Sequence, residues 1–100
     1  MAHRWMSLRA VLAYEPEMQR LGVSEVARSP RGFLTAYKRY GTAAATKNKP
    51  APRQVRHLTW GQRREQFVAR TLAQYRVNPT HRRRLALIAW AYDPDAAQHP

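Results

Sequence analysis

The sequence contains no cysteine, so disulfide bonds and thiolate metal or redox centres are excluded. It also lacks any apolar run of about 18 residues, the length that a membrane-spanning helix requires. The absence of cysteine fits a protein of a reducing compartment, and we expect a cytoplasmic location. Residues 1–14 are free of acid and weakly amphipathic, as a transit peptide also would be, but we interpret them as an ordinary first helix.

Residues that carry out catalysis are scarce as well. The six acidic residues are scattered along the chain, and the four histidines show no metal-ligand spacing such as HExxH. The four glycines form no loop that could hold a phosphate group. We therefore expect a protein that is not an enzyme, with no metal, no cofactor and no small-molecule substrate.

Positive charge is what the sequence has in excess. Eighteen Lys and Arg against six Asp and Glu give a net charge of +12, and 15 of the 18 cations are arginine. Residues 26–84 carry fifteen of these cations and a single acid, Glu65. Such a segment favours a polyanionic partner, and arginine suits bidentate contact with phosphate. A GC-rich genome produces the same arginine bias, so the bias alone does not identify a function.

The spacing of apolar residues predicts an all-α fold: a compact single domain of three to four short helices with a basic loop between helices. The expected segments are an N-terminal helical segment over 1–25, helices over 29–41, 60–76 and 79–92, a basic loop or arm over 42–58, and a frayed tail over 93–100.

Local signals set these boundaries. Ser29-Pro30 is typical of an N-cap followed by the first helical residue, and Asn78-Pro79-Thr80 repeats the device. Thr59 is a further N-cap, and Gly41 is a stop. Glu15-Pro16 leaves open whether the N-terminal segment is one helix or two.

Aromatic and aliphatic residues at helical spacing form the expected core. Its members are Phe33, Leu34, Tyr37, Phe67, Val68, Leu72, Leu85, Ile88 and Tyr92. Trp60 and Trp90 could stack on bases, but their spacing favours the core.

Basic residues outside the apolar stripes form the candidate nucleic-acid-binding set. They are Arg31, Lys38, Arg39, Lys47, Lys49, Arg53, Arg56, Arg63, Arg64, Arg70, Arg82, Arg83 and Arg84. The helix over 60–76 is the best candidate for contacting the nucleic acid, since its outer face carries Arg and Gln. A helix-turn-helix is less favoured because residues 85–92 offer no polar side chain to a groove, so we expect contact mainly with phosphates.

Arg82, Arg83 and Arg84 fall in the first turn of the last predicted helix, where the helix dipole disfavours cations. This placement hints at a phosphate ligand. Replacing the three with glutamine is therefore expected to lower affinity while thermal stability stays equal or rises slightly.

Three stretches together carry a resemblance to known proteins. SPRGFLTAYKRYG (29–41), FVARTLAQYR (67–76) and THRRRLALIAWAYDP (80–94) resemble a small family of uncharacterised proteins from bacteria and tailed phages. The resemblance covers roughly residues 23–94. Arg84 stands where the family has histidine, and the segment between 76 and 80 is shorter than in many members.

The resemblance implies a phage or prophage setting but no activity. Two functions stay open at this point. The first is a nucleic-acid-binding protein, with DNA favoured over RNA, in the host cytoplasm or the phage particle. The second is a structural (virion) or assembly protein whose basic face meets an acidic protein surface. Neither reading involves a membrane, and the sequence does not indicate an oligomeric state.

Overall fold

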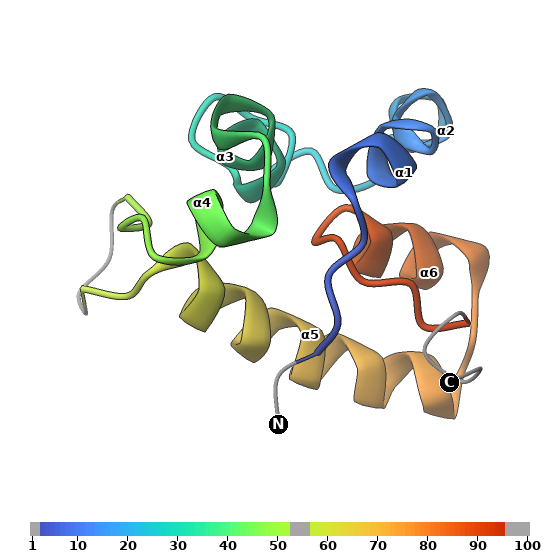
Figure 1. Cartoon of the computed structure of the whole chain (residues 1–100). Helices are drawn as coiled ribbons and strands as arrows, with labels where there is room; N and C mark the ends of the chain where they lie inside the picture. The colour runs from blue at the N-terminus through green and yellow to red at the C-terminus, as the bar shows by residue number, and fades with distance from the viewer. Residues whose placement is uncertain (1–2, 53–56, 96–100) are drawn as a thin grey trace.

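The computed structural model describes residues 3–52 and 57–95 (Figure 1). It contains the helices α1 (Leu8–Leu12), α2 (Glu15–Leu21), α3 (Phe33–Tyr40), α4 (Ala43–Lys47), α5 (Trp60–Val77) and α6 (His81–Ile88). The only extended pairing within those ranges is an isolated antiparallel bridge between Pro50 and Thr59. The all-α single domain is confirmed, with more and shorter helices than the predicted three to four.

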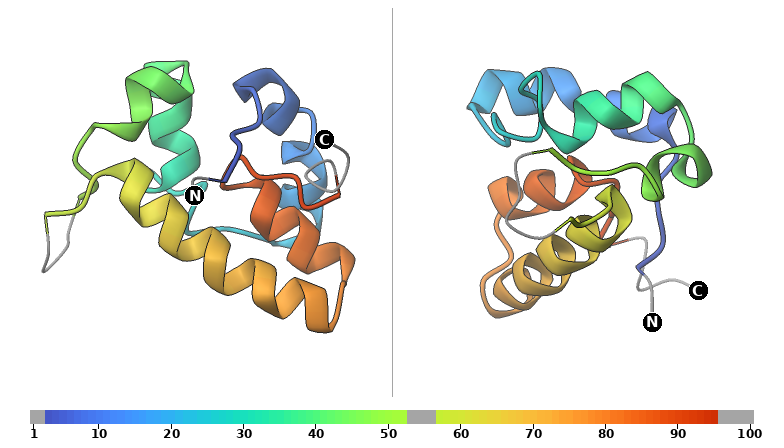
Figure 2. Two further views of the ribbon diagram at one scale, coloured as in Figure 1. Left: turned by 60° about the horizontal axis from the view of Figure 1, so that its bottom comes forward. Right: turned by 90° about the vertical axis from the view of Figure 1, so that its left-hand side faces the viewer.

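The long helix α5 forms the base of the molecule (Figures 1 and 2). Helix α6 folds back beside it, while α1, α2 and α3 form a second layer over the pair. The N-terminal segment runs from α1 down one side of the molecule and reaches α5 (Figures 1 and 2). None of the helices described is both long enough and apolar enough to cross a bilayer.

One of the three predicted N-caps is confirmed: Thr59 caps α5 in a capping box with Gln62. Asn78 is not an N-cap, because it ends α5, and Thr80 caps α6 two residues later by accepting from the N–H of Arg83. Ser29 is not an N-cap, because its hydroxyl donates to the carbonyl of Val26 within a turn. Helix α3 begins after Gly32 instead, three residues later than the Ser29-Pro30 signal predicts.

Helix α6 ends at Ile88, whereas the prediction carried it to residue 92. Ala91 takes a left-handed conformation with φ 62°, which breaks the helical path. Residues 89–92 form a tight buried turn, closed by the N–H of Tyr92 donating to the carbonyl of Leu87. The carbonyl groups of this turn are therefore left for partners outside α6.

The N-terminal segment is two helices, which settles the open alternative. Ser7 caps α1, Pro16 lies in the first turn of α2, and Gly22 ends α2 at φ 65°. Val11 and Met18 of these helices are fully buried, although neither was in the predicted core.

The described residues 42–52 include a helix that the predicted loop or arm did not contain. Thr42 caps this short helix, α4, which lies so close to α5 that a Cβ on Gly61 would meet the Lys47 carbonyl at 2.9 Å. The N–H of Trp60 then donates to the carbonyl of Lys49. These contacts hold residues 47–49 against the start of α5.

The predicted core is confirmed except at Phe67, which is half-buried against it. Trp60 and Trp90 are core residues, 3% and 7% exposed. Phe33 stacks on Trp90 with ring centroids 4.7 Å apart, and Phe67 stacks on the same indole at the same distance. The aromatic cluster thereby joins α3 to α5 through the turn that follows α6.

Candidate nucleic-acid interface

Arg64 belongs to the core, so the prediction that it contacts phosphate is wrong. Its side chain has no exposed surface. All five of its N–H donors are used, at 2.7–3.0 Å, and the acceptors are the Trp90, Ala91, His3 and Arg4 carbonyls and the Glu65 carboxylate. The guanidinium also lies over the Trp5 ring, 4.5 Å from its centroid.

The physical reason is the set of carbonyl groups that the turn after α6 directs away from its own helix. The Trp90 carbonyl accepts from Arg64, and the Ala91 carbonyl accepts from both Arg64 and the backbone N–H of Met6. Burial lowers the pKa of Arg64 to about 10, while Glu65 opposes that shift. Arg64 therefore stays charged at neutral pH and serves as a joint between three segments.

The side chains of the cluster Arg82–Arg84 also make hydrogen bonds and ion pairs within the protein. Arg82 donates to the Leu21 carbonyl and Arg83 to the Asn78 carbonyl. Arg84 is the most engaged, 23% exposed, and its ion pairs reach Asp93 at 3.6 Å and Asp95 at 3.0 Å. Its Nε forms no hydrogen bond within the described residues, so the contact with Asp95 is electrostatic.

These contacts reverse the expectation that the arginine cluster can be removed without loss of stability. Arg84 donates a hydrogen bond to the hydroxyl of Tyr14 and lies over its ring at 5.3 Å. We expect Arg84→Gln to lower the free energy of unfolding by about 1 kcal/mol, since a partly exposed charge network contributes more than a lone surface pair. Urea denaturation of the variant beside Arg83→Gln, which removes no ion pair, measures this. Equal stability of the two variants would show that the network contributes nothing.

Carboxylates elsewhere occupy several of the remaining cations. Lys38, a predicted site residue, pairs with Glu15 at 2.7 Å, and Arg20 pairs with Glu17 at the same distance. Hydrogen bonds from Arg20 and then His81 lower the pKa of Glu17. The acids thus neutralise charge around α1, α2 and α6.

Four predicted arginines lie along one hollowed face instead, and we call this set the arginine groove. Its members are Arg31, Arg39, Arg63 and Arg70. Three adjoining hollows make the groove, with Arg31 shared by the first two and Arg63 by the last two. No carboxylate lines any of the three hollows. Among the described residues no carboxylate pairs with these arginines, so the groove keeps its full positive charge.

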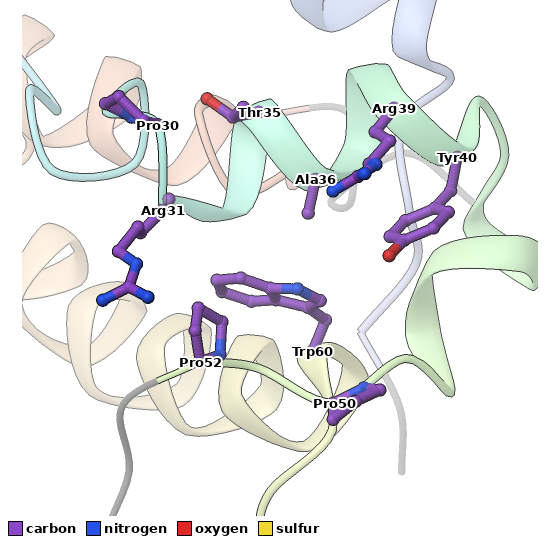
Figure 3. Close-up of a pocket in the computed structure, with 10 residues that line it drawn as sticks. Pro30, Arg31, Thr35, Ala36, Arg39, Tyr40, Pro50, Pro52 and Trp60 are labelled. Carbon is purple, nitrogen blue, oxygen red and sulfur yellow. The ribbon is translucent and has the colours of Figure 1, made fainter.

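The first hollow is a pocket of about 210 Å³ between α3, residues 50–52 and the start of α5. Figure 3 shows the ring of Trp60 lying across it, with Arg31 at one end and Arg39 and Tyr40 at the other. Farther along the groove, Arg63 lies 5.6 Å from the Trp60 ring centroid.

Arg70 continues the groove toward the middle of α5, and it lies 5.9 Å from the Phe67 ring centroid. Stacking of this kind holds a guanidinium in place while its N–H groups stay available to a ligand.

The remaining predicted residues lie around this groove or outside the described part of the chain. Lys47 is exposed at the end of α4, and Lys49 lies over the Tyr40 ring at 5.2 Å. Arg53 and Arg56 fall outside the described residues. Tyr40, Pro50 and Pro52 line the pocket without having been predicted. The sequence did offer one indication of these pocket residues, because a tyrosine and two prolines border a basic stretch.

Comparison of the chain with protein-family models, with curated proteins and with solved structures finds no match in any of the three. The resemblance to proteins of bacteria and tailed phages stays a prediction. No group of three metal-ligating side chains occurs within residues 3–52 and 57–95. The chemistry of the site accordingly has to be argued from its arginines and aromatic rings.

Proposed function

We propose that this chain is a non-enzymatic nucleic-acid-binding protein that contacts phosphates through the arginine groove, with DNA as the first partner to test. The observation that carries the proposal is the position of Arg31, Arg39, Arg63 and Arg70 along three adjoining hollows with no carboxylate in their linings. Guanidinium groups suit the oxygens of a phosphate, and a nucleic-acid backbone repeats that ligand at short intervals. A phage or prophage origin is compatible with this role.

The distribution of the acids supports the groove over the rest of the surface. Glu15, Glu17, Glu65 and Asp95 are all engaged by cations outside the groove. Around α1, α2 and α6 a polyanion would have to compete with these carboxylates. Along α3 and the first part of α5 it would meet the arginines of the groove, with which no carboxylate pairs among the described residues.

Removing the four groove arginines gives the direct test. The variant with Arg31, Arg39, Arg63 and Arg70 changed to Gln is expected to bind duplex DNA at least tenfold more weakly at low salt. The slope of log K against log salt should become shallower by about 3–4, since each lost phosphate contact removes about 0.9. Fluorescence anisotropy of a labelled duplex, titrated at several salt concentrations, measures both quantities.

A matched control removes the same charge elsewhere. Arg4, Arg9, Arg20 and Arg76 are exposed and lie outside the groove, so changing them to Gln gives an equal net charge. This control should keep most of the affinity and slope. Equal losses in both variants would mean that the charge is generic. A flat salt response of the wild type, together with nuclease-insensitive assembly into large particles, would favour the structural or assembly role instead.

A further inference from the structure

The pocket at the α3 end of the arginine groove combines charge with flat rings. Arg31 and Arg39 flank it, and the rings of Tyr40, Trp60 and Pro50 line it (Figure 3). Its volume of about 210 Å³ is below the range of about 300–1,000 Å³ that is usual for drug-sized ligands. The pocket is therefore suited to one small planar group attached to an anion.

The pocket lining includes two polar groups, the indole N–H of Trp60 and the hydroxyl of Tyr40. Neither the indole N–H of Trp60 nor the hydroxyl of Tyr40 makes a hydrogen bond within the described part of the chain. In Figure 3 the nitrogen edge of Trp60 faces the end of the pocket where Arg39 and Tyr40 lie, and the Tyr40 hydroxyl points inward. Both groups belong to residues that line the pocket, so the polar edge of a ligand seated there would meet them.

We infer that this pocket holds one unpaired nucleotide, and that the groove consequently prefers single-stranded to duplex DNA. The inference rests on the proposed function. Aromatic and proline rings would pack against the base, the Trp60 N–H and the Tyr40 hydroxyl would meet its polar edge, and Arg31 and Arg39 would hold the flanking phosphates. A base inside a duplex is covered on both faces by its neighbours and cannot enter, whereas a single strand offers its bases freely.

The fixed position of the pocket walls strengthens the inference. Trp60 packs edge-on against Phe33, with ring centroids 5.8 Å apart, and its backbone N–H is bonded to the Lys49 carbonyl. The ammonium group of Lys49 lies over the Tyr40 ring, and this cation–π contact helps to hold one face of the ring in place. Rigid rings lose little conformational freedom when a base packs against them, so the contact is retained as net affinity.

A variant that fills the pocket without changing charge separates this inference from the proposed function. Ala36 projects into the pocket from α3 (Figure 3), and Ala36→Phe would occupy it while every arginine remains. Ala44→Phe, at an exposed position of α4 outside the three hollows, is the matched control. The probes are labelled oligothymidine and a hairpin duplex with the same number of phosphates.

The wild type should bind oligothymidine more tightly than the hairpin at equal salt. Ala36→Phe should weaken binding of oligothymidine about tenfold, change binding of the hairpin less than twofold and leave the salt slope unaltered. In NMR spectra the indole N–H peak of Trp60 should shift with oligothymidine and not with the hairpin. Circular dichroism and thermal melting confirm that each variant is folded.

Two results would overturn the inference. If Ala36→Phe is folded and binds oligothymidine as well as Ala44→Phe does, the pocket holds no base, although the groove still binds phosphates. If the wild type shows the same affinity and slope for both probes, the preference for single strands is absent. A flat salt response to both probes would instead remove the proposed function itself, so the two failures are distinguishable.

Discussion

Replacing Arg64 with methionine is expected to lower the free energy of unfolding by about 3–5 kcal/mol, the largest loss from any single position considered. Methionine fills much of the same volume but donates no hydrogen bond. Four backbone carbonyls and one carboxylate would lose a donor at once, around a side chain that has no exposed surface. The Ala91 carbonyl would keep the Met6 N–H and the Glu65 carboxylate the His3 N–H, so the cost falls mainly on the Trp90, His3 and Arg4 carbonyls.

Guanidinium chloride denaturation followed by circular dichroism measures this loss. Arg63→Met is the matched control, because Arg63 is the adjacent residue of α5 and is half-buried at the groove, with no hydrogen bond among the described residues. It should change stability by less than about 1 kcal/mol. Arg64→Lys should also be strongly destabilising, since an ammonium donates from one point and cannot span acceptors on three segments. Comparable midpoints for Arg64→Met and Arg63→Met would refute the role of Arg64 as a joint.

Replacing Gly32 with alanine is the second large effect that we expect, a loss of about 3 kcal/mol or more. A Cβ at this position would lie 2.1 Å from the Val26 carbonyl oxygen and 2.3 Å from that of Ala27. Backbone atoms cannot rotate out of the way as a side chain can. The turn before α3 would have to open, and the bond from the Leu34 N–H to the Ala27 carbonyl, 2.9 Å long, would be strained or lost.

Gly41→Ala provides the comparison for Gly32→Ala. Gly41 has φ 84°, where alanine is strained, but a Cβ there would meet no atom within 4 Å. Its replacement should cost about 1 kcal/mol from backbone conformation alone. Gly32 has φ −89°, which suits any residue, so its effect is purely steric. Thermal melting of the two variants should rank Gly32→Ala as much the less stable, and the opposite order would show that the turn yields easily.

Local signals predicted much of the fold because their physics is contained in a few neighbouring residues. The capping box at Thr59 and the left-handed stop at Gly41 depend only on side chains and backbone within one turn of helix. The error at Ser29 comes from a hydrogen bond that spans seven residues, more than the one helical turn over which a capping signal acts. The carbonyl of Ala27 accepts from the Leu34 N–H, which folds residues 26–32 into a turn and delays the helix to Phe33.

The end of α6 could not be read from apolar spacing. Residues 89–92 are all buried, so their composition suits a buried helix and a buried turn equally well. The turn is favoured by a partner from another helix, because Arg64 on α5 donates hydrogen bonds to the Trp90 and Ala91 carbonyls. Arg64 is separated from Trp90 by 26 positions and from Ala91 by 27, which is beyond the reach of local patterns.

The sequence shows which residues are basic but not where the fold places them. Charge and arginine content identified the basic residues, yet they could not separate Arg63 from Arg64. A spacing of four residues from Trp60 through Arg64 to Val68 was the available signal, because it places Arg64 on the buried stripe. The pairing of Lys38 with Glu15 and of Arg84 with Asp95 depends on the packing of distant segments. These pairs offset part of the positive charge, whereas among the described residues no carboxylate pairs with the four groove arginines.

The joint at Arg64 also bears on the order in which the chain can fold during synthesis. Its guanidinium binds the His3 carbonyl, 61 positions earlier, and the Ala91 carbonyl, 27 positions later. Until Ala91 has left the ribosome, a charged group with unsatisfied donors sits on the inner stripe of α5, and burying that stripe is unfavourable. Helices α1, α2 and α3 consequently have no folded α5–α6 layer to pack against at that stage. We expect the tertiary structure to form late and cooperatively. The nascent chain should stay largely unfolded, and accessible to proteases, until the turn after α6 has been synthesised.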